Sequence, residues 1–173
     1  MTKLVVIGQG YVGLPMALRA AEVGLSVVGL DTKRSVVDAL NEGRSHIDDI
    51  TGDELQASLA RGYSASDDPA CIAEADVVIV CVPTPLAADG GPDLGAVEGA
   101  ARTIGEHVRP GTLVVLESTT YPGTTEEVFA PLVTASGLRA GVASSDSAAA
   151  AASTSAVTSN IGNQRLRTMT RQS

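Results

Sequence analysis

The stretch KLVVIGQGYVGLPMALRAAEVGLSVVGLD, residues 3–31, decides the fold of this chain. A short apolar run is followed at once by three glycines in the spacing G-x-G-x-x-G, at Gly8, Gly10 and Gly13. Apolar residues at helical spacing come next, and a second apolar run then ends in Asp31. The order is therefore strand, glycine turn, helix, strand and acid within about thirty residues, which is typical of a dinucleotide-binding unit.

Each part of this unit has a physical role. Gly8 permits a tight turn off the strand, Gly10 lets a pyrophosphate approach the backbone, and Gly13 lets the helix pack close to the sheet. The free N–H groups and the dipole of the helix N-terminus favour the phosphates. The carboxylate of Asp31 accepts hydrogen bonds from the ribose hydroxyls and repels a 2′-phosphate, so the sequence predicts NAD as cofactor in preference to NADP.

Two observations bear on the strength of this prediction. Lys33 and Arg34 follow the acid closely, and we expect these cations to soften the preference for NAD without reversing it. The alternative, a glycine turn in some other α/β sheet, leaves Asp31 unexplained.

Composition bounds the class of protein. The 173 residues are 44% hydrophobic and 2% aromatic, which suits one α/β domain with an aliphatic core. A net charge of −8 argues against nucleic acid and anionic membranes as partners. Cys71 and Cys81 lack metal-ligand spacing, so we expect two reduced thiols and no metal site. The sequence shows neither a signal peptide nor a membrane span, and we expect a cytoplasmic protein.

Strand and helix patterns alternate along the chain, which predicts an α/β fold with a doubly wound parallel sheet of the Rossmann type. In such sheets ligands bind beyond the carboxyl ends of the strands. Four segments fall at such ends: Gly8 to Gly13, Asp31, Pro83–Thr84 and Ser118–Thr119. Their convergence predicts a single cofactor site.

Helix starts can be read from capping signals. Thr51 and Glu54 have the spacing of a capping box, and Asp68 precedes a proline as an N-cap does. Thr124 and Glu127 have the same capping-box spacing, which predicts a further helix beginning there.

The composition changes near residue 142, which divides the chain into a cofactor-binding domain, residues 1–141, and a tail, residues 142–173. The tail is rich in Ala, Ser and Thr and carries three arginines and one acid. Such a segment buries too little apolar surface to offset its ordering entropy, so we expect a disordered C-terminal tail. The sheet edge beside it would then stay unpaired.

Four motifs, at residues 8–15, 82–86, 92–94 and 117–127, closely resemble the UDP-glucose/GDP-mannose dehydrogenase family. The likeness is strongest to bacterial nucleotide-sugar 6-dehydrogenases, including the UDP-N-acetyl-mannosamine type. It covers residues 1 to about 141 and implies an NAD-binding Rossmann domain.

The resemblance implies an oxidoreductase that converts the C6 alcohol of a UDP-sugar to a carboxylate with two NAD per turnover. It also implies roles for the cofactor-binding residues, with the pyrophosphate at the glycines, the adenosine ribose at Asp31 and the nicotinamide half at the later strand ends. Thr119 would face the reaction centre in a supporting role. The implied set is Gly8, Gly10, Tyr11, Val12, Gly13, Asp31, Arg34 (adenine side), Pro83, Thr84, Ser118 and Thr119. The hydroxyls of Thr84 and Thr119 could instead satisfy backbone groups, and Glu117 could be a surface carboxylate.

The sequence departs from the family after Gly141. Val142 to Asp146 stands where a Ser-Pro-Glu-Arg-type motif belongs, and the family's catalytic cysteine, dimerising helix and sugar-nucleotide domain have no counterpart here. We therefore expect a truncated chain that binds cofactor without turnover and without the family's oligomer. A frameshift in the coding sequence would explain the change.

Two alternatives stay open at this point. The chain could be a non-catalytic NAD-binding module or a remnant of an enzyme. It could also belong to the 3-hydroxyacid dehydrogenase group, which shares the glycine fingerprint but leaves residues 82–86 and 117–127 unexplained.

Overall fold

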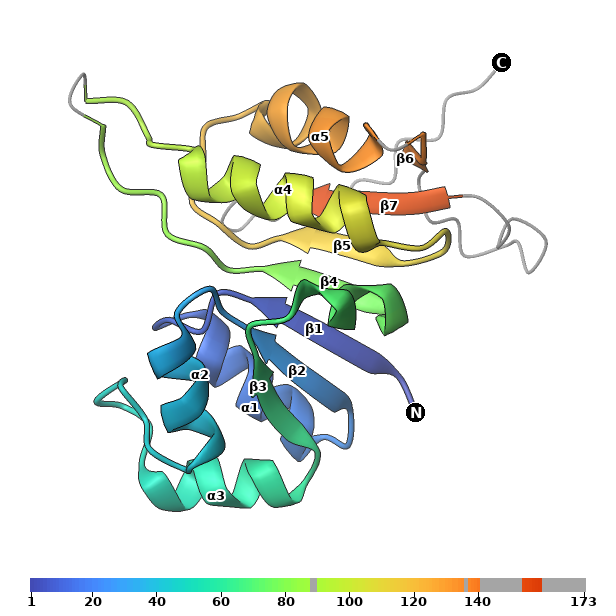
Figure 1. Ribbon diagram of the computed structural model, residues 1–173. Helices are drawn as coiled ribbons and strands as arrows, with labels where there is room; N and C mark the ends of the chain where they lie inside the picture. Colours follow the sequence, from blue (N-terminus) through green and yellow to red (C-terminus); the bar gives the residue numbers. More distant parts are fainter. Residues whose placement is uncertain (88–89, 136, 141–153, 160–173) are drawn as a thin grey trace.

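The computed structural model describes residues 1–87, 90–135, 137–140 and 154–159. Its strands form one sheet in the order β3-β2-β1-β4-β5-β7-β6, and every strand pair is parallel. This confirms the predicted doubly wound Rossmann-type sheet (Figure 1). The elements in chain order are β1 (Lys3–Ile7), α1 (Gly13–Glu22), β2 (Ser26–Leu30), α2 (Arg34–Asn41), α3 (Gly52–Ala60), β3 (Tyr63–Ser66), η1 (Pro69–Glu74), β4 (Val77–Val80), α4 (Gly95–His107), β5 (Leu113–Leu116), η2 (Thr125–Phe129), α5 (Ala130–Thr134), β6 (Arg139–Ala140) and β7 (Thr154–Ser159).

The core lies on both faces of the sheet because alternate residues of a strand point to opposite sides. In β1, Leu4 and Val6 pack with α1, α2 and α3, whereas Val5 and Ile7 pack with η1, α4 and α5. Both sets are buried, which is why the central strands are apolar throughout rather than alternating. Figure 1 shows the two helical layers on either side of the sheet.

The first two capping signals are confirmed. The Thr51 hydroxyl accepts a hydrogen bond from the N–H of Glu54, and the Glu54 carboxylate accepts one from the N–H of Thr51. Asp68 accepts a hydrogen bond from the N–H of Ala70 at 2.9 Å and so caps η1. These caps supply acceptors for N–H groups that have no partner within the helix.

The third capping signal is wrong. Thr124 has helical torsion angles rather than the extended ones of an N-cap, and its hydroxyl donates to the Tyr121 carbonyl at 2.9 Å. The helix that follows is divided into a π-helical stretch, η2, and a short α-helix, α5. Pro131 has no N–H to give to the carbonyl of Glu127, and this missing bond favours the wider turn.

The tail differs from expectation over six residues. Thr154–Ser159 forms β7, which pairs with β5 so that Leu113 lies opposite Ala156 and Leu116 opposite Ser159. The segment contains two Thr and one Val, residue types that suit strands, and the outer edge of β5 offers N–H and C=O groups for pairing. The edge of β5 is therefore paired, against expectation. The rest of the predicted disordered tail, residues 142–153 and 160–173, lies outside the described residues.

Candidate dinucleotide site

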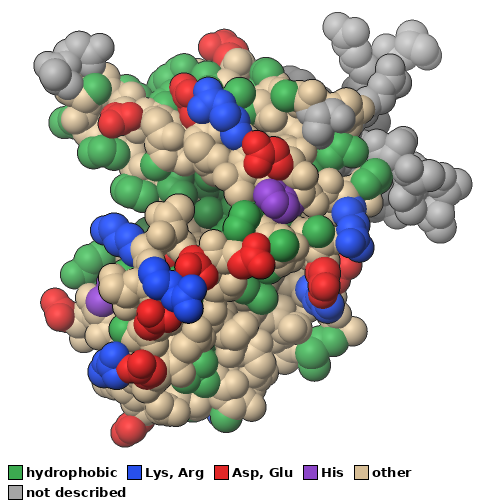
Figure 2. Space-filling view, in the orientation of Figure 1, with side chains coloured by type: hydrophobic (Ala, Val, Ile, Leu, Met, Phe, Trp, Pro, Cys, Tyr) green, Lys and Arg blue, Asp and Glu red, His purple; other side chains and the backbone are tan. Residues whose placement is uncertain are grey.

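A cleft of about 870 Å³ opens at the carboxyl ends of β1, β2, β4 and β5. This is where the strand order reverses, between β1 and β4, and a doubly wound sheet binds its ligand at such a switch point. Figure 2 shows the hollow on the left of the view, with hydrophobic side chains on its walls. All the predicted cofactor-binding residues line it except Gly13 and Arg34.

The glycine turn is built as the spacing predicts. Gly8 has φ of +89°, and a Cβ on it would lie 2.7 Å from the carbonyl oxygen of Cys81. A Cβ on Gly13 would overlap the carbonyl oxygen of Gly8. These two glycines therefore serve the turn and the close approach of α1 to the sheet, which explains why Gly13 does not line the cleft.

Gly10 has a different role. It lines the cleft, and a Cβ on it would meet no described atom within 4 Å. Among the described residues no side chain caps the N-terminus of α1, and its first turn carries no acid. The open space over Gly10 and the uncapped helix N-terminus together suit an anionic group such as a pyrophosphate.

The Asp31 carboxylate is held in place by two backbone groups. The N–H of Gln9 donates to its Oδ2 at 2.9 Å, and the N–H of Lys33 donates to its Oδ1 at 2.9 Å. Each carboxylate oxygen has a second lone pair, so the group can still accept hydrogen bonds from two ribose hydroxyls. The glycine turn and the acid at the end of β2 are thus linked directly, through the backbone of Gln9.

The Gln9 side chain is a feature that the sequence analysis missed. It is fully buried, its Nε2 donates to the Val6 carbonyl at 2.8 Å, and its Oε1 accepts from the Tyr63 hydroxyl at 2.9 Å. A Cβ on Gly29 would overlap Gln9 Oε1 and lie 2.7 Å from the Tyr63 hydroxyl. Gly29 therefore makes room for a buried polar pair that ties the glycine turn to β3.

The loops after β4 and β5 are joined by two hydroxyls. Thr84 Oγ1 donates to the Thr119 carbonyl at 2.6 Å, and Ser118 Oγ donates to the Val82 carbonyl at 2.9 Å. The Thr84 hydroxyl thus satisfies a backbone group, as its alternative interpretation held, and it lines the cleft as well. Both hydroxyl oxygens keep lone pairs free to accept hydrogen bonds. Glu117 also lines the cleft.

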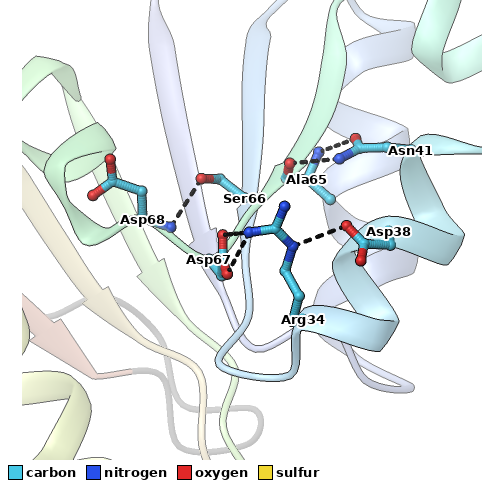
Figure 3. A network of polar contacts seen from close by, with 7 residues as sticks. All are labelled: Arg34, Asp38, Asn41, Ala65, Ser66, Asp67 and Asp68. Atoms are coloured by element: carbon cyan, nitrogen blue, oxygen red, sulfur yellow. Dashed lines mark hydrogen bonds and ion pairs between the residues drawn. The ribbon is translucent and has the colours of Figure 1, made fainter.

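Arg34 lies outside the lining of the cleft. Its Nε donates to Asp38 Oδ1 at 3.0 Å, and its Nη1 donates to Asp67 Oδ2 at 3.1 Å (Figure 3). The hydrogen bonds to Asp38 and Asp67 raise the pKa of the guanidinium above its ordinary value. Asp67 does line the cleft, together with residues from helices and loops that no local motif marks, including Thr32, His46 and Thr103.

The two cysteines are free thiols. Burial raises the pKa of Cys81, at the floor of the cleft, to about 11, and it raises that of Cys71 to about 11 as well. Neither thiol is therefore a ready nucleophile near neutral pH. In the part of the chain that the structure describes, no cluster of three or more His, Cys, Asp or Glu side chains could hold a metal ion. Nor is any described helix long and apolar enough to cross a membrane.

The strand order, the glycine turn and the acid at the end of β2 define a dinucleotide-binding Rossmann domain. Over residues 2–153 the chain matches the profile described as "UDP-glucose/GDP-mannose dehydrogenase family, NAD binding domain". The chain belongs to this family and contains its NAD-binding domain, as the sequence motifs indicated.

Individual relatives agree with this assignment. The chain is 40% identical over 142 residues to UDP-N-acetyl-D-mannosamine dehydrogenase of Pyrococcus horikoshii, covering 81% of this chain and 34% of the relative. It is 41% identical over 125 residues to NDP-N-acetyl-D-galactosaminuronic acid dehydrogenase of Ralstonia nicotianae, covering 71% and 29%. The crystal structure of GDP-mannose dehydrogenase from Pseudomonas aeruginosa superposes with a TM-score of 0.80 at 31% identity, covering 91% and 35%. The chain thus spans about a third of the length of these relatives.

Proposed function

We propose that this chain binds NAD in the cleft at the carboxyl ends of β1, β2, β4 and β5, as the cofactor domain of a nucleotide-sugar 6-dehydrogenase. The observation that carries the proposal is the combination of open space over Gly10, the uncapped N-terminus of α1 and the oriented carboxylate of Asp31. These three features suit a pyrophosphate and its neighbouring ribose.

The bound cofactor would lie across the switch point of the sheet. Gly8, Gly10, Tyr11 and Val12 would face the pyrophosphate, and Asp31 would bind the adenosine ribose. The cleft continues past Pro83 and Thr84 to Ser118 and Thr119, and these residues would contact the nicotinamide half. When bound, NAD supplies the hydride acceptor for oxidation of an alcohol. The protein residues bind and orient it.

The substrate class follows from the names of the relatives, which include dehydrogenases of UDP-N-acetyl-D-mannosamine and of NDP-N-acetyl-D-galactosaminuronic acid. We propose a UDP-sugar as substrate of the corresponding full-length enzyme, with a role in supplying sugar acids for polysaccharide synthesis in the cytoplasm. Thr119, at the rim of the cleft, would lie nearest to the reacting sugar.

The 173-residue chain itself would bind NAD without oxidising a nucleotide sugar. Cys81 is buried, Cys71 is partly buried, and the pKa of each thiol is raised to about 11, so neither suits nucleophilic attack on a sugar aldehyde. This observation favours the alternative of a non-catalytic NAD-binding module for the chain on its own.

Two measurements test the proposal. NADH fluorescence should rise on titration with the chain and should not do so with Asp31→Ala, which loses the ribose acceptor. Incubation of the chain with NAD and UDP-N-acetyl-mannosamine should give no NADH absorbance at 340 nm (a property of reduced nicotinamide). Absence of NADH binding by a folded chain would overturn the cofactor proposal, and sustained turnover would overturn the proposed inactivity.

A further inference from the structure

Arg34 is held in a clamp at the adenosine end of the cleft. Its guanidinium joins Asp38, one turn further along α2, to Asp67, just after the end of β3 (Figure 3). The same helix is tied to β3 a second time, because Asn41 donates to the Ala65 carbonyl at 2.9 Å and accepts from the Ala65 N–H at 2.8 Å. The two carboxylates therefore approach Arg34 from elements whose relative position is fixed.

The location of Arg34 and its two carboxylates bears on the choice between NAD and NADP. Arg34 stands three residues after Asp31, and an arginine at this place in a Rossmann domain can accommodate the 2′-phosphate of NADP. Here the arginine does not line the cleft, whereas its partner Asp67 does. The carboxylate rather than the cation of this pair thus faces the space beside the adenosine ribose.

We propose that Asp38 and Asp67 are specificity-determining residues, because they hold Arg34 in ion pairs outside the cleft and so withdraw the cation that a 2′-phosphate would need. Asp31 repels the 2′-phosphate, and the ion pairs with Asp38 and Asp67 keep Arg34, the cation that could bind this phosphate, outside the cleft. This inference rests on the proposed binding of NAD. It replaces the expectation that Arg34 softens the preference for NAD.

The balance of charges favours the ion pairs of Arg34 with Asp38 and Asp67 over a contact between Arg34 and a 2′-phosphate. A 2′-phosphate carries between one and two negative charges near neutral pH, and the two carboxylates already offer Arg34 a charge of the same size. Releasing Arg34 would exchange its two existing ion pairs for one new pair with the phosphate. The arginine would then face no more negative charge than it already does. Each ion pair is exposed and individually weak, so removing both carboxylates should free the side chain.

Lys33 is a second cation near this end of the cleft. It lines the cleft and has no ion pair among the described residues. Lys33 stays unchanged in every variant below and gives a constant background. Any change in the choice between cofactors can therefore be assigned to Arg34 and its carboxylates.

The test compares NADH and NADPH binding, followed by nucleotide fluorescence, in the full chain and in Asp38→Asn/Asp67→Asn. We expect the affinity for NADPH to rise about fivefold to tenfold, as one new charge-assisted bond to phosphate would give. The affinity for NADH should change by less than about twofold, since the ribose acceptor is intact. Adding Arg34→Met to the double variant should return the NADPH affinity to the starting value.

The matched control is Glu22→Gln/Glu74→Gln. It removes the same charge and also breaks two surface ion pairs, with Arg19 and Lys3. Both lie toward the amino ends of the strands, on the side away from the cleft. This control should leave both affinities unchanged, because screening weakens charges at that distance.

Three results would overturn the inference: no gain for NADPH in the double variant, a gain that persists without Arg34, or an equal gain in the control. A gain in NADPH affinity that persists without Arg34 would show that Asp67 acts only by repelling the 2′-phosphate. A folded chain that binds neither nucleotide would overturn the proposed function and this inference with it. A chain that binds NADH but shows one of the three results would overturn only the inference.

Discussion

Replacement of Tyr63 by phenylalanine tests the claim that a buried polar pair supports the glycine turn. The substitution keeps the ring and removes only the hydroxyl. Tyr63 is 3% exposed and Gln9 is 0% exposed, so water cannot take the place of the lost donor without opening the core. Within the described part of the chain, Gln9 Oε1 has no other donor.

The expected loss follows from that burial. A buried acceptor left without its donor costs about 1–3 kcal/mol. For a domain of this size we expect a decrease in the melting temperature of about 3–10 °C. Thermal unfolding followed by circular dichroism measures it. Tyr121→Phe is the control, since that side chain is 41% exposed and its change should stay within about 0.5 kcal/mol.

A double-variant cycle makes the test sharper. Gln9→Met removes the acceptor, so adding Tyr63→Phe to it should cost less than Tyr63→Phe costs alone. The difference should be at least about 0.5 kcal/mol if the two side chains are coupled. If Tyr63→Phe were as neutral as Tyr121→Phe, or if the two changes were additive, the reasoning about this pair would be refuted.

Three further predictions follow from single groups. The thiols of Cys71, which is partly buried, and Cys81, which is buried, have pKa values raised to about 11 and should be alkylated by iodoacetamide at pH 8 at least about a hundredfold more slowly in the native chain than in urea. Equal rates would contradict this shielding of the two thiols. The capping box lowers the pKa of Glu54 in the folded chain, so the ionised carboxylate stabilises the fold. This contribution to the free energy of unfolding is fully present above the unfolded pKa of about 4.3 and is lost as the pH falls through the lower folded value. Urea melts should therefore show Glu54→Ala to be less stable than the wild type at pH 7, with a smaller difference at pH 3, and a constant difference would argue against an ionic cap. Gly105→Ala would place a Cβ 2.9 Å from the carbonyl oxygens of Leu132 and Val133, so we expect a loss of about 1–3 kcal/mol in the free energy of unfolding, and a neutral result would mean that α4 and α5 can separate freely.

Local patterns predicted the parts of the site that depend on nearby residues. Gly8 and Gly13 could be assigned because the turn and the helix approach impose a backbone constraint that only glycine meets. Asp31 could be assigned because its distance from the turn is set by one helix and one strand. Family membership, shown by the comparisons, agrees with the later motifs.

Other features could not be read locally because their partners are distant in sequence. Gln9 and Tyr63 are 54 residues apart, and Arg34 and Asp67 are 33 apart. Only the parallel pairing of β1, β2 and β3 brings them together. The predicted N-cap at Thr124 was wrong for a different reason, because the capping-box spacing was present but the backbone is already helical at that residue. Spacing alone does not fix torsion angles.

The role of Gly10 offers the most direct test of the central claim, that the cleft over the glycine turn binds NAD. The measurement is the affinity for NADH of Gly10→Ala relative to the wild type, together with the melting temperature of each free protein. A methyl group there would meet no described atom within 4 Å, so the free protein should melt within about 2 °C of the wild type. The same methyl group would stand where the pyrophosphate approaches, so the affinity should fall at least about tenfold. Unchanged affinity in a folded variant would show that the cofactor does not bind over this turn.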